Sequence, residues 1–359
     1  MLEITSKRDY WPTKEWQTAE LVDVDMDPKY LTDFEYTINS KYKNINGIVV
    51  VRRGYIVYER YYNGYCSTDT HNVASVTKSF ISALIGIAID AGYIKSVDQK
   101  VLDFFPEYLS GADNISKSTI TIKHLLTMTA PFPWKNEPLD RLRRQKDWVK
   151  YILDQLGRNG QIGNFQYSTA GTHLLSAIIT RATGMSAREF ANKHLFKTIG
   201  IKEIPDHQMK SFKLDDVFGK NVTGWIKDPQ GNTTGGWGLT ITPRDMARFG
   251  FLYLNRGIWD NNQIISEKWI DESTAWDNKQ IISEKWIEST AMNICKYGYL
   301  WWLFEVENTL AYTAAGSGGN HIFCIPQKDL VVVIASKIIQ RPQDRWALLK
   351  KYIIPAILE

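Results

Sequence analysis

An apolar run at residues 81–89 constrains the fold of this chain more than any other stretch. Isoleucine, leucine and alanine occupy most of its positions and leave no polar face, and Gly92 ends it. A helix that is apolar on all sides lies inside a core and not on a surface. We therefore predict that the chain folds around one buried helix.

Two polar residues, Ser75 and Lys78, stand at the start of this predicted helix. Residues three apart in a helix share one face, so the hydroxyl and the amine meet. Burial disfavours the charged form of a lysine, and a neutral amine can take the serine proton while the helix N-terminus favours the alkoxide. We interpret Ser75 as a nucleophile and Lys78 as its base. The alternative, a capping serine beside a solvated lysine, is less favoured because the apolar run leaves little access to water.

The composition is that of a globular protein with a large core, either one large domain or two. Of 359 residues, 44% are hydrophobic and 23% are charged. The net charge of +4 is too small to indicate a nucleic-acid partner. Cys66, Cys295 and Cys324 are too few and too scattered for a disulfide framework or a zinc site.

The beginning of the chain is polar and carries no apolar signal segment, and no stretch is long enough to span a bilayer. We expect a cytoplasmic protein without a membrane partner, although a leader removed during maturation would leave the same pattern. The oligomeric state stays open.

Strand-like segments lie at both ends of the chain, and helix-like segments lie between them. Residues 47–62 predict a hairpin, because two β-rich runs flank Gly54, which supplies a positive φ. This order indicates an α+β fold, with one sheet domain built from residues 1–74 and 220–359 and a mainly helical domain at residues 75–219. Further strands are expected at 299–306, 309–314, 321–325 and 330–335, and helices at 121–128, 147–156, 170–183, 186–195, 242–254 and 346–358.

One phrase of the sequence is repeated. Residues 259–275 are followed at once by residues 276–291, which are nearly the same but lack an equivalent of Asp271. Two copies are too few for a solenoid, so we interpret them as a tandem duplication in a surface connection, where insertions are tolerated. Short helices are expected at 266–270 and 283–287, without a catalytic role.

A serine–lysine nucleophile needs a second proton carrier and an oxyanion hole. Tyr167 stands just before a predicted helix and could share a proton with Lys78. A core tyrosine with one hydrogen bond is the alternative, and the residue alone favours that alternative. The glycine-rich residues 314–320 would let a backbone approach a ligand closely, or would form an ordinary turn.

Together these stretches resemble the serine β-lactamase-related family, which includes class C β-lactamases, DD-peptidases, esterases and 6-aminohexanoate-dimer hydrolase. Residues 75–78 match its Ser-x-x-Lys motif, and residues 167–169 stand at its Tyr-x-Asn motif. Residues 317–319 stand where β-lactamases have Lys-Thr-Gly and many esterases have His-Gly-Gly. Residues 125–129 and 235–239 are also similar to family stretches. The resemblance implies a β-lactamase-like α+β fold: an antiparallel sheet flanked by terminal helices, an inserted helical domain, and the site between them.

The resemblance also implies roles for single residues. Ser75 would be the acylated nucleophile, with Lys78 and Tyr167 as the acid–base pair. The oxyanion hole would be formed by the backbone N–H groups of Ser75 and Asn320. No metal or cofactor is implied. The substrate-binding residues would be Ser317, Gly318, Gly319, Trp134 and Trp237, although both tryptophans could equally belong to the core.

Two departures from the family pattern bear on the substrate. Thr169 replaces the asparagine of the second motif, and Ser317 replaces the lysine of the third. A hydroxyl can donate a hydrogen bond but carries no charge for a substrate carboxylate. We therefore expect a small-molecule ester or amide whose acyl part is not anionic, with weak or no β-lactamase activity.

Other functions remain open. The chain could be a penicillin-binding or sensor-like protein that is acylated at Ser75 without turnover, or it could be a true β-lactamase or D-aminopeptidase. Residues 315–319 faintly resemble the nucleophile elbow of α/β-hydrolases. That fold needs a histidine well after the serine, and His321 follows Ser317 too closely to serve.

Overall fold

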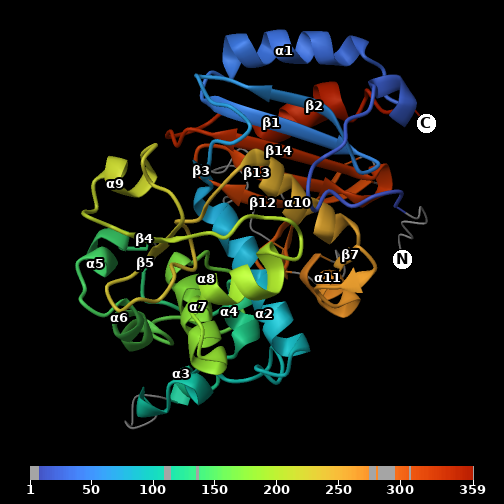
Figure 1. Ribbon diagram of the computed structural model, residues 1–359. Coiled ribbons are helices and arrows are strands. Elements are labelled where there is room, and N and C mark those ends of the chain that lie inside the picture. Colours follow the sequence, from blue (N-terminus) through green and yellow to red (C-terminus); the bar gives the residue numbers. More distant parts are fainter. Residues whose placement is uncertain are drawn as a thin grey trace.

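The central element of the computed structural model is an antiparallel sheet built from both ends of the chain (Figure 1). The structure describes residues 8–108, 115–134, 137–274, 280–281, 296–306 and 309–358. Within these ranges eight strands follow the order β2-β1-β14-β13-β12-β11-β10-β9. Their bounds are β1 Ile45–Arg52, β2 Tyr55–Tyr61, β9 Gln280–Ile281, β10 Lys296–Tyr297, β11 Trp302–Val306, β12 Thr309–Gly316, β13 Asn320–Ile325 and β14 Leu330–Ser336.

The predicted N-terminal hairpin and the predicted C-terminal strands are confirmed, and they pair with one another. Strand β1 lies between β2 and β14, with Val49 opposite Val333. All eight residues of β1 are buried, as expected for an apolar strand covered on both faces. Arg53 and Gly54 join β1 to β2 with φ angles of 52° and 90°, a positive-φ pair that suits the twist of a two-residue hairpin.

Helices cover both faces of the sheet. On one face lie α1 (Lys29–Lys41) and the C-terminal helix, which comprises α13 (Arg345–Leu348) and the π-helical turn η8 (Leu349–Ile353) (Figure 1). The other face is covered by α10 (Pro243–Leu254), with α2 (Thr77–Asp90) reaching β12. The side chain of Thr242 caps α10 and Pro243 occupies its first turn, as the sequence predicts.

The middle of the chain is mainly helical, as predicted. It holds α3 Ile115–Ser118, α4 Ile122–Leu126, α5 Leu139–Arg143, α6 Trp148–Gln155, α7 Thr169–Thr183, α8 Ala187–Ala191 and α9 Leu214–Phe218. Short strand pairs lie around it: β3 His71–Asn72 with β6 Thr240–Ile241, β4 Asp206–Gln208 with β5 Trp225–Lys227, and β7 Ile258–Trp259 with β8 Asn262–Gln263. None of the described helices is both long and apolar enough to cross a membrane.

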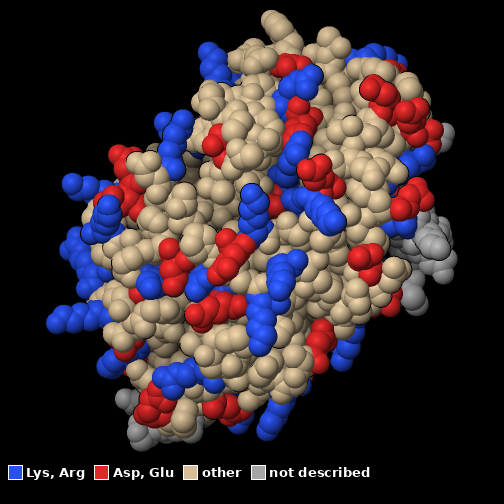
Figure 2. Space-filling view, viewed as in Figure 1, with Lys and Arg blue, Asp and Glu red and all other residues tan. Residues whose placement is uncertain are grey.

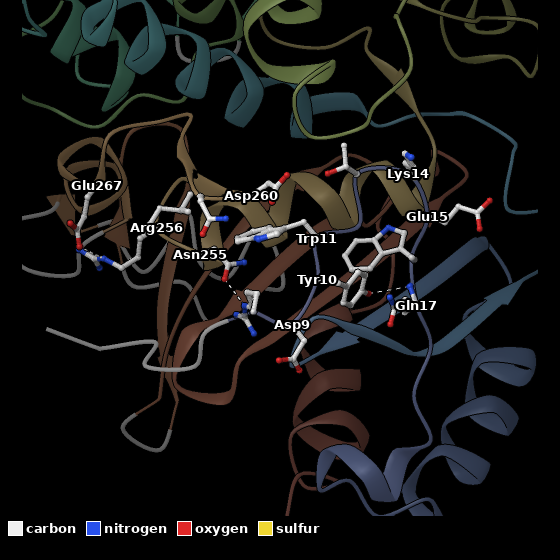
Figure 3. Close-up of a pocket in the computed structure, with 15 residues that line it drawn as sticks. Asp9, Tyr10, Trp11, Lys14, Glu15, Gln17, Asn255, Arg256, Asp260 and Glu267 are labelled. Carbon is white, nitrogen blue, oxygen red and sulfur yellow. Dashed lines mark hydrogen bonds and ion pairs between the residues drawn. The ribbon is translucent and has the colours of Figure 1, made fainter.

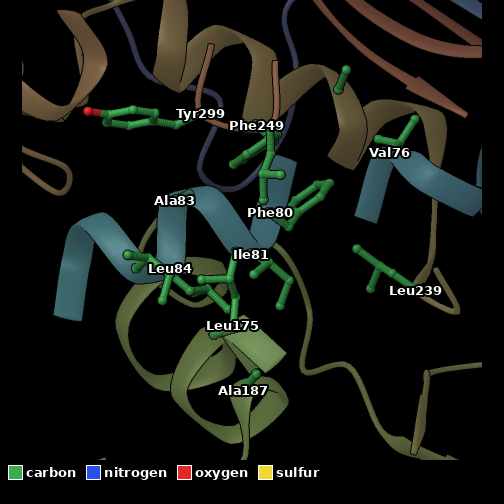
Figure 4. Packing of buried hydrophobic residues seen from close by; sticks show 14 of the residues in the cluster. Val76, Phe80, Ile81, Ala83, Leu84, Leu175, Ala187, Leu239, Phe249 and Tyr299 are labelled. Atoms are coloured by element: carbon green, nitrogen blue, oxygen red, sulfur yellow. The ribbon is translucent and has the colours of Figure 1, made fainter. Parts of the chain in front are cut away.

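Helix α2 is the buried helix that the apolar run predicts. Every residue from Thr77 to Ala88 is buried. Phe80 stacks on Phe249 of α10 with ring centroids 3.8 Å apart (Figure 4). Each large apolar side chain buried here contributes about 1.5–3 kcal/mol. One continuous core runs from the sheet through α2 into α7 and α8, so the proposed domains share their packing, and their boundaries remain a prediction.

The first copy of the duplicated phrase is anchored in the core, which corrects the expectation of a purely surface connection. Its side chains Trp259 and Trp269 are 1% and 4% exposed. A Cβ at Gly86 would lie 2.6 Å from the Trp269 ring, so only glycine leaves room for that ring against α2. The predicted short helix is confirmed as α11 (Glu267–Thr274). Of the second copy only β9 is described, and the helix expected at 283–287 lies outside the described residues.

Candidate active site

Ser75 lies in a 3₁₀ turn, η2 (Ala74–Val76), that leads directly into α2. The preceding residue, Ala74, has a φ of 49°, a left-handed conformation that costs about 1–3 kcal/mol for a residue with a Cβ. Two contacts hold it: Ala74 N donates to Asn72 Oδ1 at 3.0 Å, and Thr77 Oγ1 donates to Ala74 O at 2.7 Å. Ser75 is partly exposed between buried neighbours, so its hydroxyl stands at the accessible end of a buried helix.

The Lys78 amine lies beside the Ser75 hydroxyl, as the helix spacing predicts. Lys78 Nζ is 3.1 Å from Ser75 Oγ, 3.3 Å from Thr169 Oγ1 and 2.8 Å from the carbonyl oxygen of Gly236. The lysine is 1% exposed. A carbonyl can only accept a hydrogen bond, whereas a hydroxyl can also donate. A neutral amine could therefore donate to Gly236 and Thr169 and keep its lone pair for the Ser75 proton.

Tyr167 also belongs to this group of residues. Lys78 Nζ lies 4.9 Å from the centroid of the Tyr167 ring and over its face. The ring stacks on Trp302 of β11 at 5.7 Å with planes 16° apart. Ser168, the next residue, caps α7 by accepting a bond from Gly171 N. The cap and the stacking fix the ring beside Lys78, while its role in proton transfer remains a prediction.

Gly236 is a site residue that sequence reasoning did not identify. A Cβ at this position would lie 2.5 Å from Thr169 Cγ2, so only glycine lets the carbonyl reach Lys78. His173 of α7 holds the same loop: its Nδ1 accepts from Gly235 N at 3.4 Å, and its Nε2 donates to Asp228 at 3.0 Å. Burial acts to raise the pKa of Asp228, but the bonds from His173 and Asn232 outweigh it and lower that pKa.

Glu137 is a second residue that the sequence reasoning missed. Its Oε2 accepts a hydrogen bond from Thr169 N at 2.7 Å, and its Oε1 accepts one from Ala170 N. Burial raises the pKa of Glu137, and those two amides and the charge of Lys78 oppose the rise. In the sequence, Glu137 is recognisable only as an acidic residue among the prolines at 131–138. No spacing pattern connects it to α7.

The glycine-rich stretch forms the turn between β12 and β13, and it brings Gly316 close to the Ser75 turn. A Cβ at Gly316 would lie 3.1 Å from Ser75 N and 2.3 Å from Val73 O, so Gly316 is the residue packed against the nucleophile turn. Asn320 instead pairs with Gly316 across the hairpin. Its side chain accepts from Ser336 N and donates to Ser317 O, both at 2.8 Å, which makes it a residue that closes the turn.

Of the three turn residues expected to bind substrate, one is exposed and two are buried. Ser317 is exposed, but Gly318 and Gly319 are buried with φ angles of 84°. A Cβ at Gly319 would lie 2.6 Å from Arg345 Nε, and one at Gly318 would lie 2.7 Å from Lys337 O. These two glycines therefore allow the turn and its packing against Arg345 and Lys337, while their contact with a substrate remains a prediction.

The two tryptophans lie mainly in the core. Trp237 is 7% exposed, with the Arg143 guanidinium 5.4 Å from its ring centroid. Trp134 is partly buried and stacks on Phe132 at 5.0 Å. Trp237 thus contributes to the site through its neighbour Gly236, and Trp134 keeps some exposed surface.

A cavity of about 1000 Å³ lies elsewhere, between the N-terminal segment and the chain that follows α10 (Figure 3). Its walls include Trp11, Lys14 and Arg256, and none of Ser75, Lys78 and Tyr167 lines it. Basic and acidic side chains are interspersed over the face drawn in Figure 2. The cavity is thus separate from the group formed by Ser75, Lys78 and Tyr167.

Comparisons with known proteins bear on the family and on the fold. The sequence model of the β-lactamase family matches residues 41–349. The 6-aminohexanoate-dimer hydrolase of Paenarthrobacter ureafaciens is 25% identical over 304 residues, covering 80% of this chain and 71% of that protein. A class C β-lactamase from Rhodobacter sphaeroides superposes with a TM-score of 0.65 and 16% identity, covering 92% of this chain and 100% of its own. A family VIII carboxylesterase superposes with a TM-score of 0.66 and 17% identity, covering 91% of this chain and 96% of its own.

The fold predicted from the resemblance is confirmed by these superpositions. The family match extends over most of the chain, from before β1 into the C-terminal helix, and includes the Ser75 turn. The chain therefore belongs to the β-lactamase family, whose members are serine hydrolases.

Proposed function

We propose that this protein is a serine hydrolase that cleaves esters or amides through an acyl-enzyme on Ser75. The observation that carries this proposal is the 3.1 Å contact between Lys78 Nζ and Ser75 Oγ at a lysine that is 1% exposed. Ser75 is partly exposed, so a substrate can reach the hydroxyl while its base stays shielded from water.

Acylation begins when Lys78 Nζ takes the proton of Ser75 Oγ and the oxygen attacks the substrate carbonyl carbon. The bond from that carbon to the alcohol or amine breaks. The leaving group takes a proton from the Tyr167 hydroxyl, and Lys78 returns a proton to Tyr167. The proton of Ser75 thus ends on the released alcohol or amine, and the acyl group ends on Ser75.

Deacylation repeats these steps with water in place of the serine. A water molecule gives a proton to Lys78 and adds its oxygen to the acyl carbon. The bond to Ser75 Oγ then breaks, the serine regains a proton, and a carboxylic acid leaves. Each turnover consumes one water and restores both side chains.

The negative oxygen of the intermediates needs hydrogen-bond donors. We propose the backbone N–H groups of Ser75 and Ser317. The contact of Gly316 with the Ser75 amide supports this choice, because Ser317 follows Gly316 directly at the end of β12. Asn320, the donor expected from the sequence, lies across the hairpin from Gly316 and is replaced in this proposal.

The proposed substrate class follows from the absence of the lysine that β-lactamases carry in their third motif. If Ser317 begins the third motif, the lysine of β-lactamases is replaced by a hydroxyl. If Gly316 is instead the glycine of that motif, the position falls on Ala314, which is 0% exposed and apolar. In either alignment, the position that holds lysine in β-lactamases carries no positive charge in this chain. Esters or amides whose acyl part is not anionic are therefore the proposed substrates, and the relatives named as a dimer hydrolase and a carboxylesterase support an amide or ester substrate.

The proposal is tested with p-nitrophenyl esters of short acids, short amides and nitrocefin as substrates. Steady-state turnover is expected on at least one ester or amide, is lost in Ser75→Ala, and is kept in Ser40→Ala, a control on the exposed side of α1. One burst of product without turnover would contradict hydrolysis and favour an acylated sensor. Turnover that survives in Ser75→Ala would contradict the assigned nucleophile.

A further inference from the structure

Glu137 is a partly buried carboxylate that the proposed mechanism leaves without a role. It lies at the N-terminus of α7, where it accepts hydrogen bonds from the backbone amides of Thr169 and Ala170. The bond from Thr169 N connects this carboxylate to a residue that also carries a hydroxyl. The same hydroxyl lies 3.3 Å from Lys78 Nζ.

These contacts form one continuous line from Glu137 through Thr169 to Lys78. The backbone N–H of Thr169 donates to Glu137, and the Thr169 hydroxyl offers its lone pairs to an N–H of Lys78. Lys78 in turn lies 3.1 Å from Ser75 Oγ. The low dielectric of a buried site strengthens each of these hydrogen bonds.

Helix capping alone does not explain this arrangement. Ser168 already caps α7 by accepting a bond from Gly171 N. The bond from Thr169 N to Glu137 and the 3.3 Å contact of the Thr169 hydroxyl with Lys78 connect the carboxylate to the proposed base, and the charge of Lys78 acts on Glu137. Lys78 of α2 is the titratable group that acts on Glu137, and α7 supplies the hydrogen bonds.

Resting on the proposed function, we propose that Glu137 is a positioning residue for Lys78. By fixing Thr169 through its backbone amide it orients the lysine, and its charge stabilises the ammonium that forms when Lys78 takes the Ser75 proton. Lys78 is 1% exposed, so a new positive charge on it would lose most of its hydration. Such a charge requires an opposite charge nearby. Glu137 itself neither gains nor loses a proton in the cycle.

The test compares Glu137→Gln, Thr169→Val and their double variant in steady-state hydrolysis of the best ester. Each single change should lower kcat by about 10- to 100-fold, as expected within one hydrogen-bonded network, with KM within about twofold. Because both changes interrupt the same line, the double variant should be no slower than the slower single variant. Thr169→Ser keeps the hydroxyl and should retain most of the wild-type kcat.

A matched control is Glu189→Gln, which alters a carboxylate that also accepts at a helix N-terminus, in the capping box of α8. It should leave kcat unchanged. The pH profile adds a readout that a cap would not alter. Burial raises the pKa of Glu137, so its neutralisation should lower the wild-type kcat in weak acid, and Glu137→Gln should flatten that fall.

Two results would overturn the inference. One is a Glu137→Gln protein that melts earlier but keeps the wild-type kcat below its melting temperature. The other is additivity of the two single changes. If Glu137→Gln does not fold, equal kcat in Thr169→Val and Thr169→Ser overturns it as well. Failure of the proposed function is recognised separately, because turnover would then survive Ser75→Ala.

Discussion

Lys78 Nζ lies 2.8 Å from the carbonyl oxygen of Gly236, a residue 158 positions further along the chain. The helix start thus supplies the amine, and a distant loop fixes its direction. The loop is held in turn by His173, which bridges Gly235 and Asp228. The orientation of the proposed base therefore depends on contacts between α2, α7 and the loop before β6.

The first prediction concerns this contact. In Gly236→Ala the new Cβ would lie 2.5 Å from Thr169 Cγ2 and 2.9 Å from Thr172 Oγ1, so the loop must move away from Lys78. We expect kcat to fall by about tenfold or more, because small displacements in an active site are costly. The matched control is Gly171→Ala in α7, where the nearest atom would be at 3.5 Å. It should keep kcat and gain up to about 1 kcal/mol of stability. An unchanged kcat in Gly236→Ala would show that the carbonyl does not orient the base.

The second prediction concerns the proton carrier. Tyr167→Phe should lower kcat by about 10²–10⁴-fold, the usual contribution of a general acid–base group. KM should change little, because the phenyl ring can keep its stacking on Trp302. Kinetics on one good and one poor leaving group measure the effect. An unchanged kcat on both would show that the tyrosine is only structural.

The third prediction concerns substrate charge. Short-chain esters should be hydrolysed far faster than nitrocefin, because neither Ser317 nor Ala314 offers a cation to the β-lactam carboxylate. Ser317 is exposed, so Ser317→Lys can place an ammonium there and should speed acylation by carboxylate-bearing β-lactams, whereas Ser317→Ala should not. A wild-type rate on nitrocefin that equals the rate on the best ester would contradict the argument from charge.

The fourth prediction is a loss of stability in acid. Burial lowers the pKa of His71 from 6.5 to about 4 and that of His321 to about 3. As the pH falls, the unfolded chain takes up these protons before the folded chain does. The contribution of the two histidines to the free energy of unfolding is therefore complete above about pH 6.5, and it is lost as the pH falls toward their pKa values in the folded chain. At pH 5 each histidine should cost about 1–2 kcal/mol.

Urea unfolding at pH 7 and pH 5 measures this loss. His71→Phe keeps a ring that can pack on Tyr65, whose centroid lies 4.6 Å away, and should reduce the difference between the two pH values. An equal difference in wild type and His71→Phe would show that His71 does not titrate in this way.

The sequence predicted those structural features that depend on residues close together in the chain. The buried helix follows from the apolar run, and the contact of Ser75 with Lys78 follows from the helical repeat, since both need only neighbouring residues. A sheet shared by strands from both termini was also predicted, and the structure shows that β1 pairs with β14 within it.

Contacts set by tertiary packing could not be predicted in the same way. The stretch at 314–320 has three glycines, and the sequence does not show which of them packs against Ser75; the structure identifies Gly316. Glu137 lies 32 residues before its partner Thr169, and Gly236 lies 158 residues after its partner Lys78. No periodic pattern connects such positions, so they were missed.

The measurement that tests the central claim most directly is the mass-spectrometric location of a covalent fluorophosphonate adduct. The account predicts one adduct, on the peptide that contains Ser75, with no label in Ser75→Ala and much slower labelling in Lys78→Ala. Thermal melts of the two variants would establish that they are folded. An adduct on another residue, or full labelling of a folded Ser75→Ala protein, would contradict the assignment of Ser75 as the nucleophile.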